Sequence, residues 1–111
     1  MIEPEIDERE LGQLTRQLLQ TWSELEPYAS EAKASRLTGL ERQVVERWNS
    51  LFGPEIFYVK SARDVVAHSP DTLPPTQLKG VVQVATKLRE LLLAGLQNPA
   101  AVLGQRAAAS A

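Results

Sequence analysis

Hydrophobic residues recur along this chain mostly three and four positions apart, which is the spacing of amphipathic α-helices. The pattern predicts four helices, over roughly residues 7–26, 29–52, 55–67 and 76–94, and it predicts no strands. Amphipathic helices joined by short connections pack their apolar faces together. We therefore expect an all-α fold, an up-and-down bundle of four helices, with a fifth short helix as the alternative for the C-terminal tail.

Each predicted helix carries a stripe of apolar positions that is expected to face the core. The first two stripes are Leu11, Leu14, Leu18, Trp22 and Leu25, and then Leu37, Leu40, Val44, Trp48 and Leu51. The third side is Ile56, Val59, Arg63 and Val66 with Phe57 beside them, and the fourth stripe is Leu78, Val81, Ala85, Leu88 and Leu92. We expect both tryptophans to anchor the core, and a dimer face is the alternative for Trp48.

Proline and glycine residues set the expected helix boundaries. Pro27 is expected to end or bend the first helix, and Gly39 either divides the second helix or allows a close helix contact. The Gly53-Pro54 pair stops one helix and starts the next, and Gly95 is expected to end the fourth. Residues 69–75 read Ser-Pro-Asp-Thr-Leu-Pro-Pro and are expected to form a loop.

The chain is long enough for a single domain, since it has 111 residues. We expect the bundle to occupy residues 1–97, followed by an Ala-rich tail at 98–111 that is frayed or forms a short extra helix. The sequence contains no cysteine and one histidine, which excludes disulfides, thiolate metal sites, cysteine nucleophiles and any site that needs several histidines from one chain. We expect no metal and no cofactor. No apolar run is long enough to span a membrane, so the expected location is the cytoplasm.

The formal net charge is −2 and is unevenly distributed along the chain. Residues 1–50 carry ten acidic and six basic residues, whereas residues 51–111 carry four acidic and six basic residues. An anionic ligand is therefore expected to prefer the second half, although two ordinary solvated surfaces explain the same asymmetry. Duplex DNA is a poor match, because the chain is acidic and no helix pair has the spacing of a helix-turn-helix with a basic second helix.

His68 is the one histidine of the chain, and histidine is the side chain that exchanges protons most readily near neutral pH. Arg63 and Asp64 precede it. On an unbroken helix, positions 63 and 68 point about 140° apart. Pro70 is expected to end the helix near His68, which would let the imidazole turn back toward Arg63 so that the two hold one phosphate. The ordinary alternatives are a histidine at a helix C-terminus and a local ion pair between Arg63 and Asp64.

The stretch Arg63-Asp64-Val65-Val66-Ala67-His68 resembles the Arg-polar-x3-His signature of HEPN domains, which are all-helical bundles of four or five helices. As in that superfamily, the signature stands at the end of one helix, before a loop and a closing amphipathic helix, and the aromatic pair Phe57-Tyr58 precedes it. The resemblance in motif covers residues 55–94. Position 70 is Pro, where some HEPN toxins have a tyrosine.

The resemblance implies a metal-independent endoribonuclease that acts as a homodimer, with signature residues from two protomers meeting in a cleft. By similarity, Arg63 would stabilise charge on the scissile phosphate, His68 would act as general acid or base, and Asp64 would fill the polar position beside the arginine. Attack by the ribose 2′-hydroxyl would leave a 2′,3′-cyclic phosphate and a 5′-hydroxyl. By family analogy, the chain would be the toxin of a toxin–antitoxin pair or part of a phage-defence system, with a cognate antitoxin or regulatory protein as a partner.

Lys60, Lys79 and Tyr58 are candidate RNA contacts. The ordinary explanation of the lysines is two solvated charges, and that of Tyr58 is packing against the fourth helix. The alternative function belongs to another class: a non-catalytic helical interaction or dimerisation module, antitoxin-like or regulatory. It needs no chemistry at His68, and it predicts a large exposed apolar face that only a partner covers.

Overall fold

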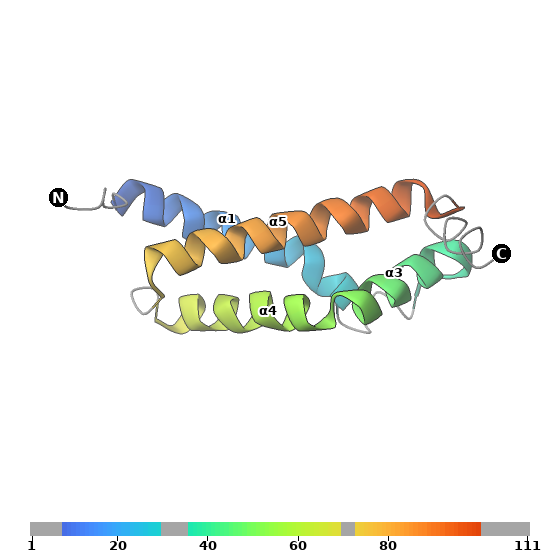
Figure 1. Ribbon diagram of the computed structural model, residues 1–111, viewed down its shortest axis with the longest axis horizontal. Helices are drawn as coiled ribbons and strands as arrows, with labels where there is room; N and C mark the ends of the chain where they lie inside the picture. The colour runs from blue at the N-terminus through green and yellow to red at the C-terminus, as the bar shows by residue number, and fades with distance from the viewer. Residues whose placement is uncertain (1–7, 30–35, 70–72, 101–111) are drawn as a thin grey trace.

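The computed structural model describes residues 8–29, 36–69 and 73–100 of the chain. In these residues it contains no strand and four α-helices, namely α1 (Glu8–Ala29), α3 (Gly39–Leu51), α4 (Gly53–His68) and α5 (Pro75–Gln97) (Figure 1). The four helices share one hydrophobic core. The predicted all-α helical bundle is therefore confirmed.

α5 is the helix around which the others are arranged, because it contacts α1, α3 and α4. α1 crosses α5, whereas α3 and α4 run end to end in the same direction, opposite to that of α5 (Figure 1). α4 also contacts α1. The chain therefore goes out along α1, returns along α3 and α4, and goes out again along α5.

The apolar face of α1 is the predicted one. Leu18, Trp22 and Leu25 are buried, and Leu11 and Leu14 pack against the core from its edge. The expected hydrophobic stripe of this helix is therefore correct along its whole length.

The end of α1 differs from the prediction, because the helix continues through Pro27 to Ala29. A proline removes one backbone donor but leaves the rest of the last turn able to form. Asn49 of α3 holds this turn, since its Nδ2 donates to the Tyr28 carbonyl at 3.0 Å and to the Val45 carbonyl at 2.9 Å. A tertiary contact thus extends the helix beyond its expected end.

α3 begins at Gly39, well after the predicted start near residue 29, and residues 30–35 of that prediction lie outside the described residues. The φ angle of Gly39 is 63°, in the left-handed region that glycine adopts without strain. A continuous helix cannot pass through such a residue. A single helix with a close contact at Gly39 is therefore wrong, and the first of the two shorter helices falls mainly on residues outside the described part.

The core face of α3 is rotated from the predicted stripe. Val44 and Trp48 are buried as expected, but Leu40 and Leu51 are 48% and 57% exposed. Val45 is fully buried in their place. Leu40 and Leu51 lie in the terminal turns of α3, which the packing against α5 leaves uncovered.

The Gly53-Pro54 pair separates α3 from α4, as predicted. Phe52 belongs to the hydrogen-bond pattern of both helices: its N–H donates to the Trp48 carbonyl at 3.0 Å, and its carbonyl accepts from the Ile56 N–H at 2.8 Å. Pro54 has no N–H to offer, which is harmless at the start of a helix. Because only Phe52 interrupts the helices, α4 keeps the general direction of α3 (Figure 1).

The core face of α4 consists of Ile56, Val59, Ala62 and Val66. Arg63 lies on the same side of α4, as predicted, but its side chain stays 39% exposed at the edge of the core, because burying its charge would be costly. The prediction is wrong for Phe57, which does not join the core, since it is 70% exposed.

The apolar stripe of α5 is confirmed at all five predicted positions, and Val82 is buried as well. Gly95 does not end this helix, which continues to Gln97 with Gly95 buried inside it. Packing against the other helices outweighs the low helix propensity of glycine here. Arg89 adds an ion pair with Glu24 of α1 at the surface.

The described residues of the connection between α4 and α5 are Ser69, Leu73 and Pro74, and none is helical, as predicted, whereas Pro75 of the predicted loop already belongs to α5. Residues 70–72 lie outside the described residues, and Leu73 is buried in the core cluster. Of the predicted Ala-rich tail, only residues 98–100 are described, so the expectation of fraying or a short helix falls mainly on residues outside the described part.

Trp48 anchors the core as predicted, and so does Trp22, since each is 4% exposed. The Trp48 Nε1–H donates to the Leu88 carbonyl of α5 at 3.1 Å in a buried contact. An indole needs such an acceptor when it is buried. This hydrogen bond therefore fixes the position of α3 along α5.

We predict that Trp48→Phe lowers the free energy of unfolding by about 1–3 kcal/mol, through lost volume and the lost hydrogen bond to α5. Leu51→Ala is the control, because Leu51 is largely exposed, and its effect should stay within about 0.5 kcal/mol. Urea unfolding followed by circular dichroism measures both. Equal effects of the two substitutions would contradict the anchoring role.

Gly39 and Gly53 form a second matched pair, because neither has any atom within 4 Å of the position that a Cβ would take. Gly39→Ala should cost about 1 kcal/mol of unfolding free energy, since alanine is strained at a φ of 63°. Gly53→Ala should be neutral or slightly stabilising, because the φ angle of Gly53 is not positive and alanine fits there without strain. The substitution also lowers the conformational entropy of the unfolded chain, which favours the folded state. The same unfolding experiment compares them.

Candidate functional site

The three predicted catalytic residues occupy the last turns of α4. The helix runs unbroken to His68, and the Ser69 N–H closes it by donating to the Val65 carbonyl at 2.7 Å. An α-helix turns by about 100° per residue, so Asp64 and His68 lie one above the other on the same side. Arg63 lies about 140° from His68 around the helix. The predicted end of the helix at His68 is confirmed.

Arg63 and Asp64 form an ion pair, with 3.0 Å between Nη1 and Oδ1. Their side chains are 39% and 49% exposed, so water screens the pair. A guanidinium has five N–H donors, and this contact uses one of them. Arg63 can therefore contact a second anion while it keeps Asp64, or exchange Asp64 for it.

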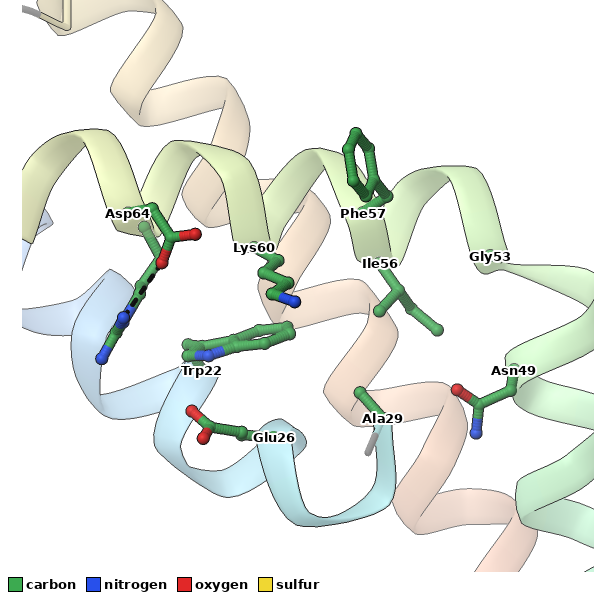
Figure 2. Close-up of a pocket in the computed structure, with 10 residues that line it drawn as sticks. Trp22, Glu26, Ala29, Asn49, Gly53, Ile56, Phe57, Lys60 and Asp64 are labelled. Carbon is green, nitrogen blue, oxygen red and sulfur yellow. Dashed lines mark hydrogen bonds and ion pairs between the residues drawn. The ribbon is translucent and has the colours of Figure 1, made fainter. Parts of the chain in front are cut away.

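A groove between α1 and α4, which we call the α1–α4 groove, has a volume of about 350 Å³. Its lining residues are Trp22, Glu26, Ala29, Asn49, Gly53, Ile56, Phe57, Lys60, Arg63 and Asp64. Figure 2 shows Trp22 and Glu26 on the α1 side and Lys60 reaching from α4 toward the indole. This volume is at the lower end of those seen for ligand pockets in proteins.

The charges in the α1–α4 groove balance, because Lys60 and Arg63 face Glu26 and Asp64. Lys60 and Glu26 form no ion pair with any residue that the structure describes. A phosphate entering here would find two cations within one turn of α4. It would also displace Asp64 from Arg63 or lie beside it.

A second and shallower groove, which we call the His68 groove, lies at the end of α4 and has a volume of about 330 Å³. It is lined by Asp64, Val65, His68 and Ser69. His68 is exposed and has no hydrogen-bond or ion-pair partner among the described residues. Its imidazole is therefore accessible to a ligand from solution.

Asp64 connects the two grooves, since it lines both. Arg63 lines the α1–α4 groove and His68 lines the other, so within one chain these two residues do not share a pocket. A ligand that contacts both must extend across Asp64, over about 7.5 Å along the helix axis. A phosphodiester strand has that reach, and the Arg63 guanidinium already contacts Asp64 at the border of the His68 groove.

Of the predicted RNA contacts, Lys60 lines the α1–α4 groove, whereas Tyr58 and Lys79 line neither groove. Tyr58 is 40% exposed on α4, and Lys79 is exposed on α5. The structure therefore brings Lys60 together with Arg63 and Asp64 and leaves the other two outside the site.

Sequence reasoning did not include Glu26 and Asn49 in the candidate site. Glu26 follows Trp22 by one helical turn, so the spacing alone could have placed its carboxylate beside the indole. Asn49 carried no such signal, because its place depends on how α3 packs against the end of α1. Only the tertiary structure identifies it.

No group of three or more His, Cys, Asp or Glu side chains in the described residues is arranged to hold a metal ion. None of the described helices is both long enough and apolar enough to cross a membrane. Comparisons with known protein families, curated proteins and solved structures found no match to this chain. The candidate site is therefore interpreted from its own residues.

We predict that Asp64→Asn changes the free energy of unfolding by no more than about 0.5 kcal/mol, because the ion pair with Arg63 is exposed. Thermal unfolding by circular dichroism measures this. Arg42→Gln is the control, since Arg42 pairs with Glu46 at the same 3.0 Å on another exposed helix face. A much larger loss at Asp64 would show that the pair holds the fold.

Proposed function

We propose that this chain is a HEPN-like, metal-independent endoribonuclease that acts as a dimer. The observation that carries the proposal is that Asp64 connects the other two candidate residues on the accessible turns of α4. Asp64 contacts Arg63 and lines the same groove as His68. The resemblance of this stretch to the HEPN signature supports the same function. The helical bundle with the motif at the end of α4 is consistent with it.

Arg63 supplies the electrostatic part of the proposed chemistry. The guanidinium fork binds two oxygens of a phosphodiester, and its charge stabilises the negative charge that develops on the phosphate. Lys60 lies one turn earlier along the same groove and contacts the neighbouring phosphate of the strand. Because the ion pair with Asp64 is weak, the phosphate replaces it at little cost.

His68 supplies the proton transfer, and Asp64 orients it. The imidazole takes the proton of a ribose 2′-hydroxyl, and the 2′-oxygen then forms a bond to phosphorus. The bond from phosphorus to the 5′-oxygen breaks, and the departing oxygen takes up a proton. The products are a 2′,3′-cyclic phosphate and a 5′-hydroxyl end. Asp64 stands one turn before His68, where its carboxylate can accept a hydrogen bond from the imidazole.

The cellular role that fits such an enzyme is a cytoplasmic toxin of a toxin–antitoxin pair or a component of phage defence, with a cognate antitoxin or regulatory protein as partner. This part of the proposal is supported by family analogy alone.

A second candidate function is a non-catalytic interaction module. One observation favours it: Phe57, Tyr58 and Val65 are 70%, 40% and 38% exposed on one helix, α4. Exposed apolar groups that cluster on one element mark a surface for a partner. This function needs no chemistry at His68.

Cleavage of end-labelled RNA in the presence of EDTA tests the first function. We expect the wild type to leave a cyclic phosphate, and we expect His68→Ala and Arg63→Ala each to lower the rate by about 10²–10⁴-fold, as for loss of an acid–base group or a charge stabiliser. Arg42→Ala is the matched control, because it removes an exposed, ion-paired arginine on another helix and should leave the rate unchanged.

Full activity of His68→Ala would overturn the assignment of the site. Absence of cleavage with total RNA, tRNA and single-stranded oligomers would leave the interaction module as the function that the chain supports.

A further inference from the structure

Phe57 has no place in the core of its own chain. It is 70% exposed, the most of any large apolar side chain in the described residues. Figure 2 shows its ring on the outer side of α4, away from Trp22 and Glu26. A rigid helix thus presents an aromatic knob to solvent, which is typical of an anchor residue at an interface.

The His68 groove offers that ring a shallow, open surface that is mainly apolar and includes Val65 beside His68. Phe57 cannot fill the groove of its own chain, because Val65 is eight residues further along the same straight helix, a rise of about 12 Å. A Phe57 that occupies this groove must therefore come from a second copy of the chain.

Phe57 and the His68 groove lie on the same face of α4. At about 100° per residue, Phe57, Ser61, Asp64, Val65 and His68 all lie within about 100° of the helix circumference. Ser61 is exposed and small, and it stands midway between Phe57 and Val65. Two copies of α4 can approach closely there, as small residues permit at helix–helix contacts.

We propose that α4 pairs with α4 of a second copy of this chain, antiparallel and with the two-fold axis at Ser61. Each Phe57 then enters the His68 groove of the other copy, which makes the interface self-complementary. A parallel pair would place Phe57 against Phe57 and leave both grooves empty. The inference gives the dimer of the proposed function an interface with two separate sites, in place of the single cleft that the resemblance implies, and it does not depend on RNA cleavage.

Two further contacts follow from the same axis. Tyr58 of the second copy lies beside Val65, so the two other exposed apolar side chains of α4 cover each other. Lys60 of the second copy lies on the same edge of the interface as Asp64, and the two residues are about 3 Å apart along the helix axis. Lys60 has no ion-pair partner among the described residues of its own chain, and Asp64 meets Arg63 through Oδ1 alone, so its other oxygen can accept a contact from Lys60 of the second copy.

The pairing gives the site a residue from the second copy. The phenyl ring of Phe57 lies against His68 and Asp64 of the other chain and shields one edge of the imidazole from water. The two His68 side chains stand about 21 Å apart along the helix axes, so the dimer has two separate sites. Each site takes Arg63, Asp64 and His68 from one chain and Phe57 from the other.

The absence of cysteine from the sequence allows a clean cross-linking test. In an antiparallel pair with axes 8–10 Å apart, two residues on the axis have their Cα atoms about 5 Å apart, within disulfide range. We therefore expect Ser61→Cys to form a disulfide-linked dimer under mild oxidation. Ser50→Cys, also an exposed serine but on α3, is the control and should remain monomeric on a non-reducing gel.

Analytical ultracentrifugation of the full chain gives an independent measurement. We expect a concentration-dependent dimer whose dissociation constant rises at least tenfold in Phe57→Ala. Leu40→Ala, which removes an exposed leucine on α3, should leave it unchanged. Because Phe57 is outside the core, circular dichroism should show the same helix content and melting temperature for both variants.

A monomer at all concentrations, or a dimer that Phe57→Ala does not weaken and Ser61→Cys does not cross-link, would overturn the pairing. The two proposals can fail separately. Specific cross-linking at Ser61 without any RNA cleavage would support the pairing and refute the nuclease. RNA cleavage that requires His68, by a dimer that Phe57→Ala does not weaken and Ser61→Cys does not cross-link, would support the nuclease and refute this interface.

Discussion

The burial of one face of α5 against α1, α3 and α4 is the constraint on which the other features of this bundle depend. α5 supplies buried side chains from Leu78 to Leu92, and it accepts the indole hydrogen bond of Trp48 through the Leu88 carbonyl. A buried polar group needs such a partner, so the contact sets the position of α3 along α5 as well as its distance. Since α4 follows α3 with only Phe52 between them, α5 indirectly places α4 too.

The position of α4 explains why the candidate chemistry and the exposed apolar surface occur together. One face of α4 packs into the core through Val59 and Val66, and the opposite face has no partner among the described elements. Arg63 lies at the edge between the two faces, beside the α1–α4 groove, whereas His68 lies on the outer face. Asp64 stands between them and lines both grooves. In the proposed enzyme, α4 would therefore separate the anion-binding Arg63 from the proton-transferring His68 by part of a turn, and an extended RNA strand would bridge the two.

The two proposals are linked through this outer face. A second copy that inserts Phe57 beside His68 uses the surface that the interaction module would also need, and it leaves Arg63 in the α1–α4 groove open to a strand. Dimer formation alone does not distinguish an enzyme from a binding module. The distinction depends on whether His68 transfers a proton once the interface is formed.

The sequence by itself determined the helical class, the apolar faces of α1 and α5, the break at Gly53-Pro54 and the end of α4 at His68, because these depend on local periodicity and on the backbone limits of proline and glycine. It also identified Arg63, Asp64 and His68 as neighbours on one helix. Only the tertiary structure decided that α1 continues through Pro27, that α5 continues through Gly95, and that Val45 rather than Leu40 and Leu51 is in the core. It also decided that Arg63 and His68 line different grooves and that Phe57 stays outside the core. The physical reason is that contacts between helices, which no local pattern encodes, outweigh propensity at helix ends and select which edge of each apolar stripe is covered.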